Sequence, residues 1–118
     1  MGKTVLVVDD EETVRAMMVR TLAGEGYRVL EASDGLEALE MLVAETDVSL
    51  VVTDLLMPRM GGYELAKRLA GQSRVVVLFV TAHTPSHPTE LQRPFLQKPF
   101  TPLALRAEVQ RLLTASPA

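Results

Sequence analysis

The sequence predicts an α/β fold in which a doubly wound, five-stranded parallel sheet is covered by helices on both faces. Short β-branched and apolar runs alternate along the chain with segments of helical periodicity, which is typical of strand–helix–strand units. The first, third and fourth runs are apolar on both faces, as central strands must be when helices cover both sides of a sheet. Because crossovers between parallel strands are right-handed, few topologies other than the doubly wound one remain.

The first expected strand covers residues 4–8 and is followed by a helix. Glu11 and Glu12 suit the first turn of this helix, because acidic side chains favour the positive end of the helix dipole. Two glycines end the helix, and a second strand covers residues 27–32. The apolar residues that recur on one face of the helix are Val14, Met17, Met18 and Leu22.

A second helix is expected after the turn at residues 33–35, and a third strand at residues 50–53. Gly61 and Gly62 then open a third helix. The apolar faces that we expect these helices to bury are Leu36, Leu39 and Val43 in the second and Leu65, Ala66 and Leu69 in the third.

The last two strands are expected at residues 75–80 and 95–96. Thr101 then has the side chain of a helix N-cap, and Pro102 stands at the first helical position, where its missing N–H leaves no hydrogen bond unmade. The buried face of this last helix is expected to consist of Leu105, Val109, Leu112 and Leu113.

Length and composition limit the classes of protein that the chain can belong to. Its 118 residues suit one domain, whose ordered core we expect at about residues 3–114. The formal net charge is -3 and basic residues form no run, so we expect no direct contact with nucleic acid. No apolar run approaches the length of a membrane span. The absence of cysteine excludes thiolate metal sites and fits a reducing, cytoplasmic location.

Polar residues stand where the strands are expected to end. Asp9 and Asp10 end the first strand, and the third, fourth and fifth strands end at Asp54, Thr81 and Lys98. In a parallel sheet these ends lie at one edge, which is where open α/β sheets bind ligands. Taken singly, each residue has an ordinary explanation as a helix cap, a turn residue or a solvated side chain. Their joint position at strand ends favours a functional site.

These side chains suit phosphoryl chemistry with a divalent cation. Crowded carboxylates repel one another, and a hard cation such as Mg²⁺, which binds carboxylates, waters and phosphate oxygens, relieves the repulsion. Lys98 supplies a positive charge and Thr81 a hydroxyl donor for phosphoryl oxygens. An aspartate carboxylate such as that of Asp54 is able to act as the nucleophile that takes a phosphoryl group.

Four motifs occur in an order that spans nearly the whole chain. They are Val7-Val8-Asp9-Asp10-Glu11, Asp54-Leu55-Leu56-Met57-Pro58 with Gly62 beyond, Thr81-Ala82, and Lys98-Pro99-Phe100. With these motifs the chain resembles the response-regulator receiver domains of two-component signalling, which have a CheY-like, flavodoxin-like fold. Residues 95–102 also resemble receivers at the C-terminus of hybrid histidine kinases.

The resemblance implies a phospho-accepting signalling domain rather than an enzyme, one that promotes its own phosphorylation and slow dephosphorylation. Asp54 would take a phosphoryl group from a phosphohistidine of a sensor histidine kinase or a histidine phosphotransfer domain. Mg²⁺, which Mn²⁺ could replace, would be bound by Asp10, Asp54 and the backbone carbonyl of Leu56. Asp9 would help through a water, and the Lys98–Pro99 peptide bond would be cis. A downstream protein or a linked output domain would receive the signal.

The same resemblance assigns further roles. Thr81 and Lys98 would bind the phosphoryl group, and Phe95, three residues before Lys98, would occupy the family's aromatic switch position. Leu56 lies two residues beyond the phosphoacceptor position, and His83 lies two residues beyond Thr81. Both would flank the path of the hydrolytic water and tune the lifetime of the phosphoryl group.

Two departures from the family pattern bear on these expectations. Gly61 stands where the family often has Asp, which we expect only to loosen the loop. The stretch between Thr81 and Lys98 is about one helical turn shorter than is usual in the family. Residues 83–94 also contain three prolines, which break helix interiors. We therefore expect the fourth helix to be short, displaced or missing, with an altered output face.

Two other functions are compatible with the sequence. An altered output face favours a receiver-shaped protein-interaction module in which phosphorylation is secondary. The second is an aspartate-nucleophile phosphatase, although such enzymes usually carry a second acid at the position of Leu56, so no general acid for turnover is evident. The acidic pair together with Asp54, Thr81 and Lys98 favours the phospho-accepting receiver.

Overall fold

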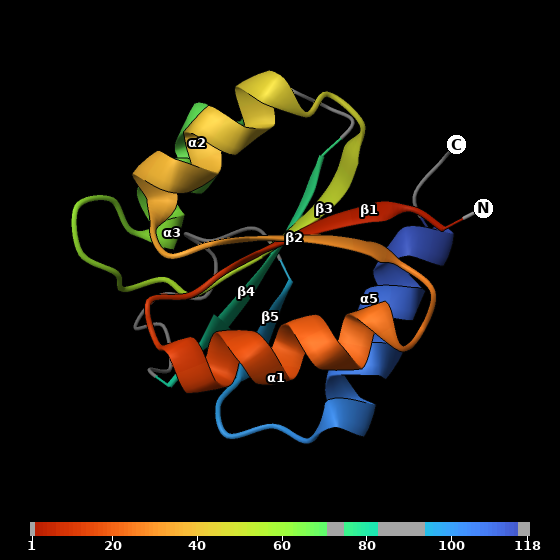
Figure 1. Ribbon diagram of the computed structural model, residues 1–118. Coiled ribbons are helices and arrows are strands. Elements are labelled where there is room, and N and C mark those ends of the chain that lie inside the picture. The colour runs from red at the N-terminus through yellow and green to blue at the C-terminus, as the bar shows by residue number, and fades with distance from the viewer. Residues whose placement is uncertain (1, 71–74, 83–93, 116–118) are drawn as a thin grey trace.

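The protein forms one parallel sheet with helices on both of its faces (Figure 1). The computed structural model describes residues 2–70, 75–82 and 94–115. The elements of these residues are, in chain order, β1 (Thr4–Val8), α1 (Glu12–Ala23), β2 (Arg28–Ala32), α2 (Gly35–Ala44), β3 (Val48–Thr53), α3 (Gly62–Arg68), β4 (Val76–Thr81), β5 (Phe95–Gln97) and α5 (Pro102–Ala115).

The strands are arranged in the order β2-β1-β3-β4-β5, and every neighbouring pair is parallel. The chain therefore begins in the interior of the sheet, moves to one edge and then crosses to the other, which is the doubly wound topology. Val8 at the end of β1 pairs with Ala32 on one side and with Thr53 on the other. The carboxyl ends of these strands consequently lie level with one another.

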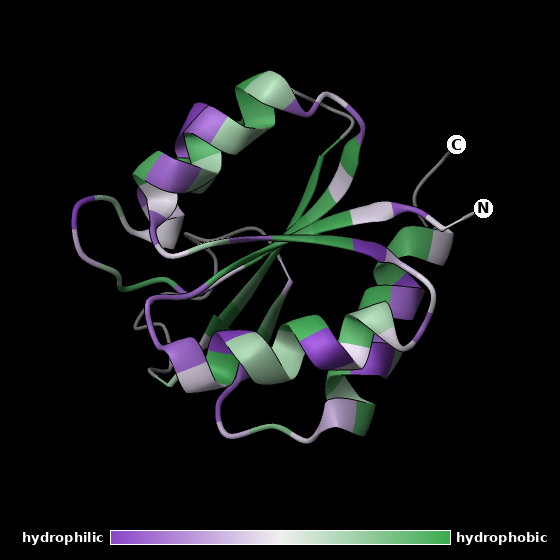
Figure 2. Ribbon diagram, viewed as in Figure 1, coloured by the Kyte–Doolittle hydropathy of each residue, from purple (hydrophilic) through white to green (hydrophobic). Residues whose placement is uncertain are grey.

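Each face of the sheet has its own hydrophobic core, because successive side chains of a strand point to opposite faces. Along β1, Leu6 and Val8 belong to the core under α2 and α3, whereas Val5 and Val7 belong to the core under α1 and α5. Figure 2 shows the apolar strands between the two helical layers. Burial of each large apolar side chain contributes about 1.5–3 kcal/mol, so the two cores hold the strand ends in place.

The buried face of α2 differs from the sequence-based expectation. Leu36 is 39% exposed and Val43 is 82% exposed, so these two residues do not pack into the core. Ala38 is fully buried instead, and Met41 and Leu42 pack against the core from the same helix. By helical spacing, Leu36 and Val43 lie on the side of α2 that carries its two glutamates, and the opposite side is the one that is buried.

The expectation that the fourth helix is short, displaced or missing is wrong for the fold. The described residues contain four helices, and the fourth along the chain, α5, follows β5 and is the longest, at 14 residues. Thr101 Oγ1 accepts a hydrogen bond from the Ala104 N–H at 3.0 Å, and Pro102 begins the helix, which confirms the helix start expected from the sequence. The segment that prompted the expectation, residues 83–93, lies outside the described residues. None of the described helices is both long and apolar enough to cross a membrane.

Candidate functional site

The parallel sheet brings the predicted polar residues to one edge. Asp9 follows the last residue of β1, Asp54 follows β3, Thr81 ends β4 and Lys98 follows β5. The hydrogen bonds between neighbouring strands continue as far as Asp9 and Asp54. The Asp9 N–H donates to Ala32 O and the Asp54 N–H donates to Val8 O, both at 3.2 Å. The backbone of each acid is therefore fixed by the neighbouring strand.

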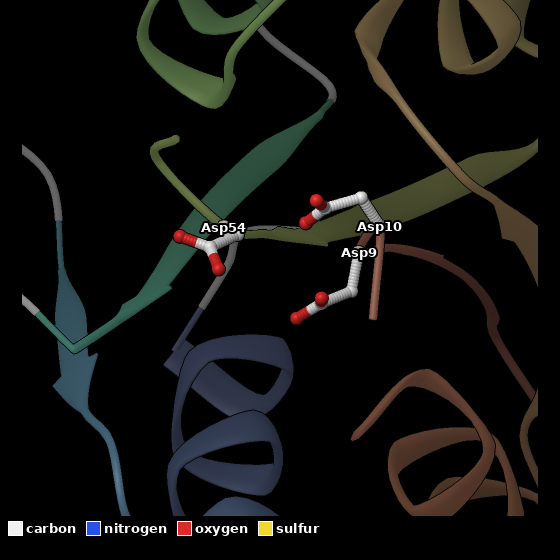
Figure 3. A group of neighbouring side chains, drawn as sticks. All are labelled: Asp9, Asp10 and Asp54. Carbon is white, nitrogen blue, oxygen red and sulfur yellow. The ribbon is translucent and has the colours of Figure 1, made fainter. Parts of the chain in front are cut away.

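Three carboxylates gather at this edge (Figure 3). One oxygen from each of Asp9, Asp10 and Asp54 lies within 4.8 Å of the others. Asp9 is fully buried and Asp54 is 8% exposed, whereas Asp10 is exposed to solvent. A set of oxygen donors at this spacing fits a hard cation such as Mg²⁺, and the exposed Asp10 leaves room for the waters that Mg²⁺ retains.

Lys98 joins two of the carboxylates. Its Nζ atom lies 2.8 Å from Asp54 Oδ2 and 2.9 Å from Asp9 Oδ2, and its side chain is only 12% exposed. The Lys98 backbone N–H donates to Thr81 O at 2.7 Å, which anchors the lysine to the end of β4. Glu11 Oε1 lies farther from the ammonium, at 3.8 Å. The lysine thus supplies a positive charge at the centre of the acidic cluster.

The remaining oxygens of the two buried carboxylates accept backbone hydrogen bonds. Asp9 Oδ1 accepts from the Glu11 N–H at 2.9 Å, and Asp54 Oδ1 accepts from the Leu56 N–H at 3.2 Å. Each of these acids therefore uses one oxygen for the following backbone turn and the other for Lys98. Such charge-assisted bonds hold the side chains in a fixed orientation.

Burial and ion pairing shift the proton affinities of this cluster. Burial raises the pKa of Asp9 above its ordinary value, although hydrogen bonds from the Glu11 N–H and from Lys98 act in the opposite direction. Burial also opposes the charged form of Lys98, but its hydrogen bonds to Asp54 and Asp9 outweigh that effect and raise the pKa of Lys98. At neutral pH the lysine is therefore a cation.

Sequence reasoning missed Arg15. This residue of α1 donates from Nη1 to the carbonyl oxygen of Asp9 at 2.8 Å and from Nε to Glu31 Oε1 at 2.9 Å. It therefore links the end of β1, which carries two of the acids, to β2. In the sequence, Arg15 is simply a basic residue in a helix that begins with acidic residues. Helical periodicity relates such a residue to its own helix and does not indicate a contact with the site.

Thr81 and Phe95 lie near each other on one face of the sheet. Thr81 is fully buried, and Phe95 is partly buried and pairs with Phe79. Phe79 and Thr81 share a face of β4, because residues two apart in a strand point the same way. Phe95 is consequently the diagonal neighbour of Thr81, on the face that α2 and α3 cover.

The other predicted site features are placed as follows. Leu56 is 61% exposed beside the acidic cluster, while His83 lies outside the described residues. The Lys98–Pro99 peptide bond is cis, as the resemblance implied. At Gly61 a Cβ atom would lie 2.5 Å from the carbonyl oxygen of Leu55, so at this point the loop takes a path that only glycine fits.

Two hollows flank the acidic cluster. One, of about 340 Å³, lies beside Lys98, between α1 and the segment that joins β5 to α5, and the other opens beside Asp10. The first is lined by Val14, Met17, Ala82, Lys98, Pro99 and Phe100. The second is lined by Asp10, Leu55, Leu56, Met57, Pro58 and Gly61. The cluster is thus open to a reagent from outside.

Residues 5–110 match the model of the response regulator receiver domain. The chain therefore belongs to the response regulator receiver domain family, the signalling modules of two-component systems. Receiver domains of this family act together with histidine kinases.

Curated relatives agree with the family. The chain is 36% identical to the chemotaxis protein CheY1 of Helicobacter pylori (strain ATCC 700392 / 26695), and the match covers 92% of this chain and 94% of that protein. It is 36% identical to the alkaline phosphatase synthesis transcriptional regulatory protein PhoP of Bacillus subtilis (strain 168), over 98% of this chain and 50% of that protein. The response regulator GtcR of Aneurinibacillus migulanus is 32% identical, and the match covers 96% of this chain and 48% of that protein. The chain thus spans about half the length of several of the curated relatives that it matches.

Solved structures share the fold. The chemotaxis protein CheY4 of Vibrio cholerae superimposes with a TM-score of 0.86 at 32% identity, covering 94% of this chain and 98% of that one. The receiver domain of the hybrid histidine kinase CckA superimposes with a TM-score of 0.80 at 33% identity, covering 93% of this chain and 98% of that one. Both stand-alone receivers and kinase-linked receivers are therefore among the similar structures, so the likeness does not select one of these contexts.

Proposed function

We propose that the domain accepts a phosphoryl group on Asp54 from a phosphohistidine of a sensor histidine kinase or a histidine phosphotransfer domain. The observation that carries this proposal is the convergence of three carboxylate oxygens within 4.8 Å of one another, with the Lys98 ammonium 2.8 Å from Asp54. The Asp54 side chain is 12% exposed, so a donor reaches it from outside while the acid stays fixed by its hydrogen bonds.

The proposed metal ligands are Asp10, Asp54 and the backbone carbonyl of Leu56, with Asp9 acting through a water. All of these donors are oxygens, the ligand type that Mg²⁺ requires and that Mn²⁺ also accepts. When bound, Mg²⁺ would supply positive charge that polarises the phosphoryl oxygens. Arg15 and the backbone hydrogen bonds to Asp9 and Asp54 keep the acids in place for it.

In the transfer, an oxygen of Asp54 forms a bond to phosphorus while the phosphorus–nitrogen bond of the phosphohistidine breaks. The electron pair of the broken bond passes to the imidazole nitrogen of the donor. Lys98, which interacts with Asp54 before the reaction, stabilises the negative charge on the transferring oxygens. Thr81 donates its hydroxyl to the bound phosphoryl group in this proposal.

The proposed switch couples Thr81 to Phe95. Their diagonal position across β4 and β5 supports this coupling, because a shift of the Thr81 side chain toward a phosphoryl group changes the space that Phe95 fills. The partner-binding surface would change as a result. Leu56, 61% exposed beside Asp54, would tune phosphoryl lifetime by limiting access of water. The same role for His83 rests on the sequence alone.

The proposed signalling partners are a kinase or phosphotransfer domain upstream and a downstream protein or linked output domain. The apolar hollow beside Lys98 supports a protein donor, because it offers apolar surface within reach of the acceptor. We take residues 1–118 as a single receiver domain acting in the cytoplasm, with no direct nucleic-acid contact and no membrane insertion.

Intact-mass measurement after incubation with acetyl phosphate and Mg²⁺ tests the proposal. We expect the wild-type protein to gain the mass of one phosphoryl group and Asp54→Asn to gain none. Asp47→Asn is a matched control, because Asp47 immediately precedes β3, at the opposite end of the strand from Asp54. Labelling of the Asp54→Asn protein at the wild-type level would remove Asp54 from its role. A wild-type protein that takes up no phosphoryl group would favour the interaction-module alternative.

A further inference from the structure

The loop that follows Asp54 is tied to the start of α2 by two successive residues. Arg59 Nε and Nη2 each lie 2.7 Å from Asp34 Oδ2. The next loop residue, Met60, accepts a hydrogen bond from the Gly35 N–H at 3.0 Å. Residues 59 and 60 of the loop thus contact residues 34 and 35 of the helix start, although 25 positions separate Arg59 from Asp34.

Gly35 has no space for a side chain at this contact. A Cβ atom there would lie 2.7 Å from both the carbonyl oxygen and the Cγ atom of Met60. Met60 is itself 6% exposed and belongs to the core under α2 and α3. The loop and the helix therefore meet at a closely packed junction rather than at a loose surface contact.

Arg59 holds a backbone conformation that the ion pair has to support. Its φ angle is 66°, in the left-handed region that residues with a Cβ atom rarely adopt. Asp34 is 5% exposed, and its second oxygen accepts the Glu37 N–H at 3.0 Å as the N-cap of α2. A buried carboxylate that is fixed by the helix start and contacted by two guanidinium nitrogens makes a strong, directional partner. Arg59 is thereby held in its unfavourable conformation.

The constrained stretch includes Leu56. Before it, the Gly62 N–H donates to Leu55 O at 2.9 Å, and the Leu56 N–H donates to Asp54 Oδ1 at 3.2 Å. After it, the contact between Arg59 and Asp34 fixes the path of the chain. The backbone that carries the Leu56 carbonyl is consequently held on both sides.

We propose that Asp34 and Arg59 are a positioning pair for the cation at the acidic cluster, which they affect by orienting the Leu56 carbonyl through the loop. The inference rests on the proposed function, in which that carbonyl is a ligand of Mg²⁺. Neither residue belongs to the acidic cluster itself, and Asp34 is the N-cap of α2, an element that supplies none of the proposed ligands.

The test is the Mg²⁺ dissociation constant, measured by isothermal titration calorimetry on the full chain. We expect Arg59→Ala and Asp34→Asn each to raise it about tenfold, as loss of an outer support of a metal ligand does. The double variant is expected to resemble the single ones, because both substitutions break the same contact. Asn retains the N-cap acceptor of α2, so Asp34→Asn removes the ion pair without removing the cap.

The opposite charges of Arg59 and Asp34 separate the positioning effect from a purely electrostatic one. Loss of a positive Arg59 would by electrostatics alone strengthen the binding of a cation, whereas loss of a negative Asp34 would weaken it. The positioning account requires both substitutions to weaken binding. Arg68→Ala is the matched control, because Arg68 has a similarly exposed side chain, at 55% against 59% for Arg59, and its partner Glu64 belongs to α3 alone.

A second readout needs no cation. In the metal-free protein, amide hydrogen exchange of residues 55–60 is expected to become several-fold faster in both variants and to stay unchanged in Arg68→Ala. An Arg59→Ala protein that binds Mg²⁺ as tightly as wild type, even with a lower melting temperature, would overturn the inference and leave only a structural role. The Asp10→Asn variant distinguishes failure of this inference from failure of the proposed function. If Asp10→Asn loses Mg²⁺ binding while Arg59→Ala keeps it, this inference alone fails. If the wild-type protein binds no Mg²⁺, the proposed function fails as well.

Discussion

The ammonium of Lys98 lies 2.8 Å from the carboxylate of Asp54 and 2.9 Å from that of Asp9, which the structure buries completely. One ammonium thus pairs with two carboxylates that directly follow two different strands. Removal of that cation would leave a buried carboxylate without a charged partner, which is among the costlier defects in a protein interior. Lys98 therefore has a role in stability as well as the role proposed for it in phosphoryl transfer.

Lys98→Ala is expected to lower the free energy of unfolding by roughly 3 kcal/mol at neutral pH, because breaking a buried pair leaves Asp9 unpaired. It is also expected to slow phosphorylation by acetyl phosphate about 100-fold through loss of charge stabilisation. Urea denaturation followed by circular dichroism and the rate of mass gain measure the two effects. Lys67→Ala is the control. Lys67 is exposed, and the contact described for its ammonium is with the ring of Tyr63. Equal losses in the two variants would contradict the assignment.

The loss of stability as the pH falls into the acid range is expected to depend in part on Asp34. Hydrogen bonding from the Glu37 N–H and the contact with Arg59 hold the pKa of Asp34 below its ordinary value of 3.8. A lowered folded-state pKa stabilises the protein above the unfolded value and loses that effect as the pH falls through the folded value. Asp34→Asn should therefore be less stable than wild type by about 1 kcal/mol at neutral pH, with the difference shrinking below the ordinary pKa of the carboxyl group. A difference that persists unchanged at about pH 3 would show that the charge of Asp34 is not its source.

Gly62 is expected to tolerate no side chain. A Cβ atom at this position would lie 2.1 Å from the carbonyl oxygen of Asp54, so Gly62→Ala requires the backbone of Asp54 to move. We expect it to cost about 1–3 kcal/mol in the free energy of unfolding and to impair phosphorylation. Gly24→Ala is the matched control, because a Cβ at Gly24 would make ordinary contacts at 3.4 Å and its φ is -63°. It should leave stability unchanged or raise it by about 0.5 kcal/mol, and a similar loss in both variants would refute the steric account.

The corrected face of α2 is tested by a pair of valines. Val43 on α2 is 82% exposed, whereas Val109 on α5 is fully buried. Val43→Ala should change the free energy of unfolding by less than about 0.5 kcal/mol, as substitutions at exposed positions usually do. Val109→Ala should lower it by about 2 kcal/mol through lost burial and the cavity left behind. Comparable losses at both positions, measured by urea denaturation, would indicate that Val43 is buried after all.

The features that the sequence predicts best are those with a regular period or a fixed topological consequence. Short apolar runs predicted where the strands lie. The apolar faces predicted for α1, α3 and α5 contain residues that are buried, such as Met18, Leu65 and Leu105. Parallel strands then required Asp9 and Asp54 to meet, because the carboxyl ends of such strands share an edge. The acidic cluster was therefore predictable before any coordinate was known.

Other features have no comparable signal. The face of α2 was wrongly predicted at Leu36 and Val43, because by helical spacing these residues lie beside Glu40 on the polar side of the helix, away from the side that is buried. The contact of Arg59 with Asp34 joins residues far apart in sequence, and nothing in the composition around Arg59 indicates a positive φ, which is usual for glycine or asparagine instead. Long-range ion pairs of this kind depend on the finished fold.

The central claim is that Asp54 is the residue that becomes phosphorylated, and its most direct test is chemical identification of the modified side chain. Protein treated with acetyl phosphate and Mg²⁺ is reduced with borohydride, which converts an aspartyl phosphate to homoserine, and its peptides are then sequenced by mass spectrometry. We predict conversion of Asp54 alone, dependent on Mg²⁺ and absent when acetyl phosphate is omitted. Conversion at Asp9 or Asp10 with Asp54 intact, or no conversion at any aspartate of a folded protein, would contradict the account.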